Sequence, residues 1–227
     1  MRKGDARREQ IMATAETLFY QKGYEQTSVQ DILDALQFSK GGFYHHFESK
    51  LALLSAICEQ RAQESYEAAQ AAVAACAGDP VAQLNALTDS GGLWRTDRLD
   101  YIGLLLRVAY REDGALMRER LKQSTLELML PLMNGVIAAG VESGVFVLPR
   151  ASLAGELVLR LTAQFTDEVA LALARGGDES EQLSDILSRL ELYRHTIERM
   201  LGAPFGSVTL YDMQHLAAVC RGIAGKM

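Results

Sequence analysis

The sequence predicts an all-α protein. Proline occurs only four times in 227 residues, and β-branched residues do not alternate with polar ones as they would in strands. Apolar residues recur instead at intervals of three and four, which places them on one face of a helix. Because 48% of the residues are hydrophobic and 23% are charged, the chain is expected to fold around a core rather than to stay disordered.

The sequence shows no recognisable targeting or membrane segment. The first eight residues are mostly polar, and no apolar run of the kind found in a signal peptide follows them. The apolar stretch 126–141 is interrupted by Glu127, Pro131 and Asn134, so it falls short of the roughly 18 uninterrupted apolar residues of a membrane helix. We therefore expect a cytoplasmic protein with no membrane partner.

Metal, cofactor and catalytic chemistry are not expected. Cys58, Cys76 and Cys220 lack the spacing of a zinc site or a redox pair, and the histidines include one close pair, His45 and His46. Adjacent residues on a helix diverge by about 100°, so this pair does not make a metal site. No nucleophile–base pair, carboxylate dyad or phosphate loop is visible. A helical enzyme ranks last among the function classes.

Four helices are predicted before residue 80. The first has Asp5 as a plausible N-cap and ends at Gly23, because glycine tolerates the left-handed backbone of a helix end. The fourth begins after a cap at Ser49 and runs to about Ala75, before Gly78-Asp79-Pro80.

The second helix begins after Thr27 or Ser28. Thr27 with Gln30 matches a capping box, and Ser28 with Asp31 is a looser version of the same motif. Both assignments remain open from the sequence.

The third helix is predicted to be short, from a cap at Ser39 to about His46. Phe43 and Phe47 are four residues apart and share its inner face. A helix this short needs such packing to be stable in water. Together with the first two helices, and with a tight turn near Gln37, it forms a helix-turn-helix arrangement.

The opposite face of the third helix has chemistry that suits DNA. Lys40 can meet a phosphate or a guanine edge, and Tyr44 and His46 can donate hydrogen bonds to phosphate oxygens. Gly41 and Gly42 allow a close approach to a groove, although each disfavours the helix by roughly 1 kcal/mol. Without the flanking pattern, these residues would simply form a solvated helix face.

The net charge of −6 does not argue against DNA binding. Residues 1–50 contain seven basic and seven acidic side chains, so residues 51–227 carry the whole of the −6. Net charge influences steering and solubility rather than fold. An acidic larger part can therefore accompany a neutral DNA-binding segment.

Residues 7–57, and above all GYEQTS at 23–28 and SKGGFYHHFESK at 39–50, resemble the DNA-binding domain of the TetR family. The resemblance implies that the third helix is the recognition helix and that its neighbours contact phosphates. The DNA-binding residues predicted in this way are Thr27, Ser28, Ser39, Lys40, Gly41, Gly42, Tyr44, His45, His46 and Lys50. The chain departs from the family pattern at two positions. Gln37 stands where glycine is common and is strained if its φ is positive, and Gly42 replaces a common threonine.

The remainder predicts further helices and a second, larger domain. We expect helices at 80–90, 97–111, 114–143 with a kink or break at Pro131, 151–175, 180–201 and 209–224. The DNA-binding domain is expected at 5–65 and the larger helical domain at 66–227.

The resemblance implies that the larger domain binds an effector and dimerises through its last long helices. The predicted dimer residues are Leu157, Leu161, Phe165, Leu187, Leu190 and Tyr193, with an intramolecular core as the alternative role. The predicted effector-binding residues are Trp94, Tyr101, Arg107, Tyr110, Met117, Met129 and Met133, because ligand sites are mostly apolar with a few polar groups.

The main hypothesis is therefore a ligand-responsive repressor. It would bind a palindromic double-stranded DNA operator as a homodimer and respond to a small-molecule effector. One alternative is a small-molecule-binding helical protein with weakened DNA contacts, to which the departures at Gln37 and Gly42 point. An activator of the same fold would have the same sequence features.

Overall fold

The computed structural model describes residues 3–90, 102, 106, 110 and 114–224. Every regular element within these residues is a helix, which confirms the all-α prediction. The helices are α1 (Lys3–Lys22), α2 (Val29–Leu36), α3 (Lys40–Tyr44), α4 (Lys50–Ala75), α5 (Pro80–Ser90), α7 (Ala115–Glu142), α8 (Ala151–Arg175), α9 (Glu179–Leu201) and α10 (Met213–Ala224).

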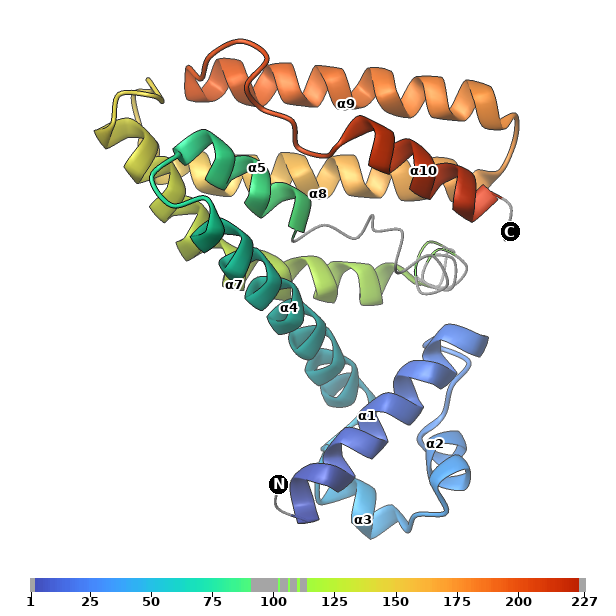
Figure 1. Ribbon diagram of the computed structural model, residues 1–227. Coiled ribbons are helices and arrows are strands. Elements are labelled where there is room, and N and C mark those ends of the chain that lie inside the picture. The colour runs from blue at the N-terminus through green and yellow to red at the C-terminus, as the bar shows by residue number, and fades with distance from the viewer. Residues whose placement is uncertain (1–2, 91–101, 103–105, 107–109, 111–113, 225–227) are drawn as a thin grey trace.

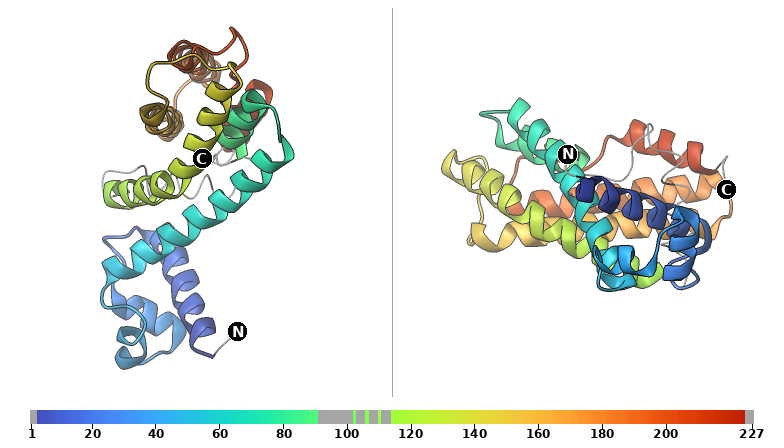
Figure 2. Two further views of the ribbon diagram at one scale, coloured as in Figure 1. Left: turned by 90° about the vertical axis from the view of Figure 1, so that its left-hand side faces the viewer. Right: turned by 90° about the horizontal axis from the view of Figure 1, so that it is seen from below.

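The helices form a small N-terminal unit and a larger body, joined by α4 (Figure 1). The N-terminal unit consists of α1–α3 and the first part of α4, and the body consists of α5 and α7–α10 with the last part of α4. The side view in Figure 2 shows α4 running from one part to the other. One helix thus connects the two parts without an intervening loop.

Each part has its own hydrophobic cluster. In the N-terminal unit, buried side chains from Ile11 to Cys58 pack together, with Phe19 and Phe43 at 0% exposure. In the body, a larger cluster extends from Ala69 to Ile223. Met117 is the exception, since it belongs to α7 but is buried in the N-terminal cluster.

The predicted bounds agree closely with most of the helices, and three differences have physical reasons. α1 already begins at Lys3, so Asp5 lies inside it and is not its cap. α7 continues through Pro131, so the helix does not break there, although the proline nitrogen cannot donate a backbone hydrogen bond and its ring crowds the carbonyl four residues earlier. α10 begins at Met213 rather than near 209, since Leu210 has a φ of +56° that does not fit a right-handed helix.

The helix α7 is long and apolar enough, by length and composition alone, to cross a membrane. This is weak evidence, because the core helix of a soluble protein passes the same test. In the structure α7 packs against α4, α5 and α8.

Candidate functional site

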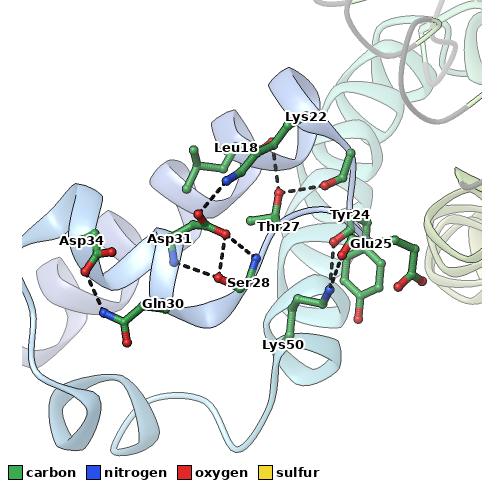
Figure 3. A network of polar contacts seen from close by, with 11 residues as sticks. Leu18, Lys22, Tyr24, Glu25, Thr27, Ser28, Gln30, Asp31, Asp34 and Lys50 are labelled. Atoms are coloured by element: carbon green, nitrogen blue, oxygen red, sulfur yellow. Dashed lines mark hydrogen bonds and ion pairs between the residues drawn. The ribbon is translucent and has the colours of Figure 1, made fainter.

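The beginning of α2 is closed by a reciprocal capping box. The Asp31 backbone N–H donates to Ser28 Oγ at 3.1 Å, and the Ser28 N–H donates to Asp31 Oδ2 at 2.7 Å. Lys22 adds an ion pair to Asp31 at 2.7 Å, which ties the end of α1 to α2 (Figure 3). The hydrogen bond from Lys22, followed by those from Ser28, holds the pKa of Asp31 well below its usual range.

Thr27 neither caps α2 nor faces outward, the two roles that the sequence suggested for it. Its hydroxyl donates to the carbonyl of Gly23 at 2.7 Å, and the side chain is fully buried. Gln30 is occupied with Asp34, to which its side-chain amide donates at 2.7 Å. The Thr27–Gln30 capping box is therefore wrong, and Thr27 closes the end of α1 instead of facing DNA.

The turn between α2 and α3 is a left-handed helix end. Gln37 has a φ of +55°, and its N–H donates to the carbonyls of Leu33 and Asp34. The N–H of Phe38 donates to the carbonyl of Leu33 at 3.0 Å. The φ of Gln37 is therefore positive, as the predicted strain at this position requires. The turn nevertheless keeps the backbone hydrogen bonds of a helix end.

The helix α3 is held by its aromatic side. Phe43 and Phe47 are buried with ring centroids 6.0 Å apart, and the guanidinium of Arg8 lies 5.1 Å from the ring centre of Phe47. Ser39 caps the helix by accepting the Gly42 N–H at 3.3 Å. These contacts fix which face of α3 points outward.

The outward face of α3 carries the predicted contact residues. Tyr44 is 53% exposed, Lys40 and His45 are exposed, and His46 is half-buried. Apart from the backbone of the helix itself and the adjacent residues, no atom lies within 4 Å of where a Cβ of residue 41 would stand, and for residue 42 the nearest is Ser39 Oγ at 3.5 Å. Packing within the protein thus does not require glycine at either position.

Lys50 is engaged within the protein. Its ammonium donates to the Tyr24 carbonyl at 2.9 Å and to the Glu25 carbonyl at 3.4 Å, and it lies 4.2 Å from the ring centre of Tyr24 (Figure 3). It thereby fixes the α1–α2 turn to the start of α4. A phosphate contact from Lys50 stays a prediction, and no local pattern in the sequence pointed to its internal role.

A cavity of about 650 Å³ lies in the body between α4, α7 and α8. Three of the predicted effector residues line it: Tyr110, Met117 and Met129. Met133 does not line the cavity and is fully buried in the body cluster. Trp94, Tyr101 and Arg107 lie outside the described residues.

Besides Tyr110, the cavity wall contains polar side chains that sequence reasoning missed. The Tyr110 hydroxyl donates to Asp167 Oδ1 at 2.8 Å, and Lys122 forms an ion pair with Asp167. Thr166 Oγ1 and the Tyr211 hydroxyl are 3.1 Å apart. These pairs join residues far apart in the chain, so no local spacing could have revealed them.

Burial raises the pKa values of the two tyrosines in the cavity wall. It raises the pKa of Tyr211 to about 12, and together with the charge of Asp167 it raises the pKa of Tyr110 far above its ordinary value. Both side chains therefore stay neutral at physiological pH and can exchange hydrogen bonds with a ligand.

The predicted dimer residues divide by exposure. Leu157 is 49% exposed, and Leu161, Leu187 and Tyr193 are half-buried. Phe165 and Leu190 are fully buried in the body cluster, so their assignment to an interface is corrected to an intramolecular core. The same two helices also expose Leu153, Leu171 and Leu192.

Comparison with known proteins identifies the N-terminal segment. Residues 11–57 match the family described as bacterial regulatory proteins, tetR family. An uncharacterised HTH-type transcriptional regulator of Bacillus subtilis, YerO, is 45% identical over 53 residues, which cover 23% of this chain and 18% of that protein. The HTH-type transcriptional repressor KstR2 of Rhodococcus jostii is 41% identical over 51 residues, which cover 22% and 25% of the two chains. These similarities thus span only about a quarter or less of the relatives' length.

The similarity of fold extends over the whole chain. The structure of RolR in complex with resorcinol superposes with a TM-score of 0.54 and 17% identity, covering 99% of this chain and 96% of that one. At this identity the likeness concerns the fold, an N-terminal helix-turn-helix and a larger helical part. The match to the tetR description covers residues 11–57, which hold most of α1 and all of α2 and α3, and the rest of the chain has the matching architecture. Residues 11–57 therefore form a helix-turn-helix segment of the tetR type found in bacterial regulatory proteins, within a chain that shares its overall helical fold with RolR.

Proposed function

We propose that this protein is a transcriptional repressor of the bacterial cytoplasm that binds a palindromic operator as a homodimer. The proposal depends mainly on one observation, which is that α3 has a buried and an exposed face. Phe43 is buried, while Lys40, Tyr44 and His45 are exposed. A helix held from behind by aromatic packing can enter a major groove without losing its own support.

Each exposed group has a chemical role in this proposal. Lys40 and His45 face the groove, where they meet base edges or phosphates, and Tyr44 donates to a phosphate oxygen. Ser28 lies at the exposed start of α2 and is a further phosphate contact. Because Gly41 and Gly42 leave open space, the backbone of α3 can come close to the base pairs.

The homodimer would form through α8 and α9. Leu153 and Leu157 on α8 and Leu192 on α9 are exposed, with Leu192 at 65%. Two copies related by a two-fold axis would cover these side chains and place two α3 helices about 34–36 Å apart, one turn of DNA.

The effector would be a small molecule bound in the cavity. Its volume of about 650 Å³ lies within the range of roughly 300–1,000 Å³ of small-molecule sites. Apolar groups such as Met129 and hydroxyl groups such as Tyr110 and Tyr211 line it together, and RolR, which shares the fold, has been seen with resorcinol. An effector that binds one dimer geometry better than the other would release the operator.

Selection of bound DNA from a random pool tests the proposal. A palindromic consensus is expected, and Lys40→Ala and Tyr44→Ala should each weaken binding to it without unfolding the protein. Gln21→Ala, an exposed change in the last turn of α1, is the control and should bind normally. Affinity should also fall steeply as salt rises, since phosphate contacts release counterions. Failure to enrich any sequence would overturn the proposal.

A further inference from the structure

The cavity and the N-terminal unit share a charged side chain. Arg61 of α4 lines the cavity. Its guanidinium also donates two parallel hydrogen bonds to Glu16 of α1, from Nε to Oε1 at 2.7 Å and from Nη2 to Oε2 at 2.6 Å. Bidentate pairs of this kind fix orientation as well as distance.

Further contacts connect the Arg61–Glu16 ion pair to the rest of the N-terminal unit. Glu16 is only 12% exposed, and Tyr20 adds a hydrogen bond to Oε1 at 3.2 Å. The end of α1 is in turn paired with α2 through Lys22 and Asp31 (Figure 3). A movement of Arg61 would therefore act on α1 and α2 together.

An apolar contact occurs at the same place. Met117 of α7 lines the cavity and is 3% exposed, and its side chain is buried in the cluster of the N-terminal unit. Leu121, one turn further along α7, also lines the cavity and packs against that cluster. One end of the cavity is thus walled by side chains that support the N-terminal unit.

We propose that Arg61 is the positioning residue through which occupation of the cavity reorients the N-terminal unit, with Met117 as the neighbouring apolar contact. A ligand that fills this end of the cavity displaces Arg61. Both hydrogen bonds to Glu16 are then lost, because they depend on one guanidinium orientation. This inference rests on the proposed function, and it names the contact by which that function is regulated.

Arg61 has a second partner that provides a matched control. Its Nη1 donates to Glu64 Oε2 at 2.8 Å, and Glu64 lies on α4 itself, three residues away. The Glu64 pair is also an arginine–carboxylate ion pair, with a single hydrogen bond, but it does not connect α4 to α1. Glu16 does not line the cavity, so changing it leaves the cavity wall intact.

The test uses a side chain in place of an unidentified ligand. Ala163 of α8 lines the cavity, and Ala163→Trp fills part of it. The dissociation constant for the selected operator is measured for this variant alone and combined with Glu16→Gln or Glu64→Gln. Alone and with Glu64→Gln, the tryptophan should weaken operator binding about tenfold, a typical coupling between sites. With Glu16→Gln, the further weakening should be less than about twofold.

The outcomes separate the inference from the proposed function. Equal weakening by Ala163→Trp in the Glu16→Gln and natural backgrounds would overturn the role of Arg61, and operator binding and its control by the cavity would both stand. No weakening in any background would overturn control by the cavity altogether. If Ala163→Trp does not give a folded protein by circular dichroism, Ala163→Phe replaces it in the same comparison.

Discussion

Replacing Gln37 with glycine should stabilise the N-terminal unit. Gln37 ends α2 with a φ of +55° and a ψ of 42°. This left-handed conformation is unfavourable for an L-residue with a side chain by roughly 1–2 kcal/mol. Glycine adopts it without that steric penalty.

The size of the effect follows from what the substitution keeps and loses. The Gln37 side chain is exposed, and the hydrogen bonds of the turn are made by the backbone, so both N–H contacts remain. Glycine loses more conformational entropy on folding, which offsets roughly 0.5–1 kcal/mol of the gain. The net stabilisation is therefore expected to be about 0.5–1 kcal/mol.

Urea unfolding followed by circular dichroism measures this difference, with Ala35→Gly as the control. Ala35 is an exposed residue inside α2, two positions earlier. The same glycine should there destabilise by about 1 kcal/mol, because it weakens a right-handed helix. The two substitutions should thus have opposite signs. If Gln37→Gly destabilises as much as Ala35→Gly does, the backbone at 37 is not left-handed in solution and the reasoning fails.

Three further predictions concern packing and pH. Phe43→Ala should destabilise the N-terminal unit by about 3–5 kcal/mol, measured by thermal unfolding; little change would refute the support assigned to that ring. Gly155→Ala should destabilise the body by about 1–3 kcal/mol in urea unfolding, because a Cβ there would overlap the buried Asn134 Oδ1, and an unchanged midpoint would show that α7 and α8 separate easily. The pKa of Asp31 is lowered by folding, so the stability it provides is complete above its ordinary pKa of 3.8 and is lost as the pH falls toward the lower folded value. Unfolding at pH 7 and pH 3 should therefore differ less for Asp31→Asn than for the natural protein.

Local signals predicted the helices well because their ends depend on nearby residues. Ser39 and Ser49 each cap the helix that follows by accepting an N–H three residues ahead, and Gly23 ends α1 with a φ of +94°. The buried face of α3 was also predictable, since the four-residue spacing of Phe43 and Phe47 determines it.

Roles set by distant partners could not be predicted. Ser28 is only a somewhat better cap by type than Thr27, and Thr27 instead donates to the carbonyls of Gly23 and of Leu18, nine residues earlier in the chain. Lys50 likewise meets carbonyls 26 and 25 residues away in the chain. The cavity wall depends on pairs such as Tyr110 with Asp167, whose spacing carries no periodic signal.

The two glycines of α3 have no side chains with which to contact bases, so few residues of this helix can recognise the DNA sequence. With Gly41 and Gly42 bare, Lys40 and His45 are the residues predicted to face the groove with side chains that can bond to bases. Gly42→Thr tests this idea, because the nearest atom to a Cβ at 42 is Ser39 Oγ at 3.5 Å, an ordinary contact. The variant should fold with unchanged or slightly higher stability, since threonine has the better helix propensity by a few tenths of a kcal/mol.

Its effect on DNA should be one of sequence preference. A threonine methyl and hydroxyl at this position would meet base edges or phosphates that glycine does not touch, and good base contacts discriminate by about 1–3 kcal/mol. Selection from a random pool should therefore yield a consensus that differs from that of the natural protein at one or two positions in each half-site. An identical consensus and affinity would mean that position 42 does not approach the DNA, and the placement of α3 in the groove would have to be abandoned.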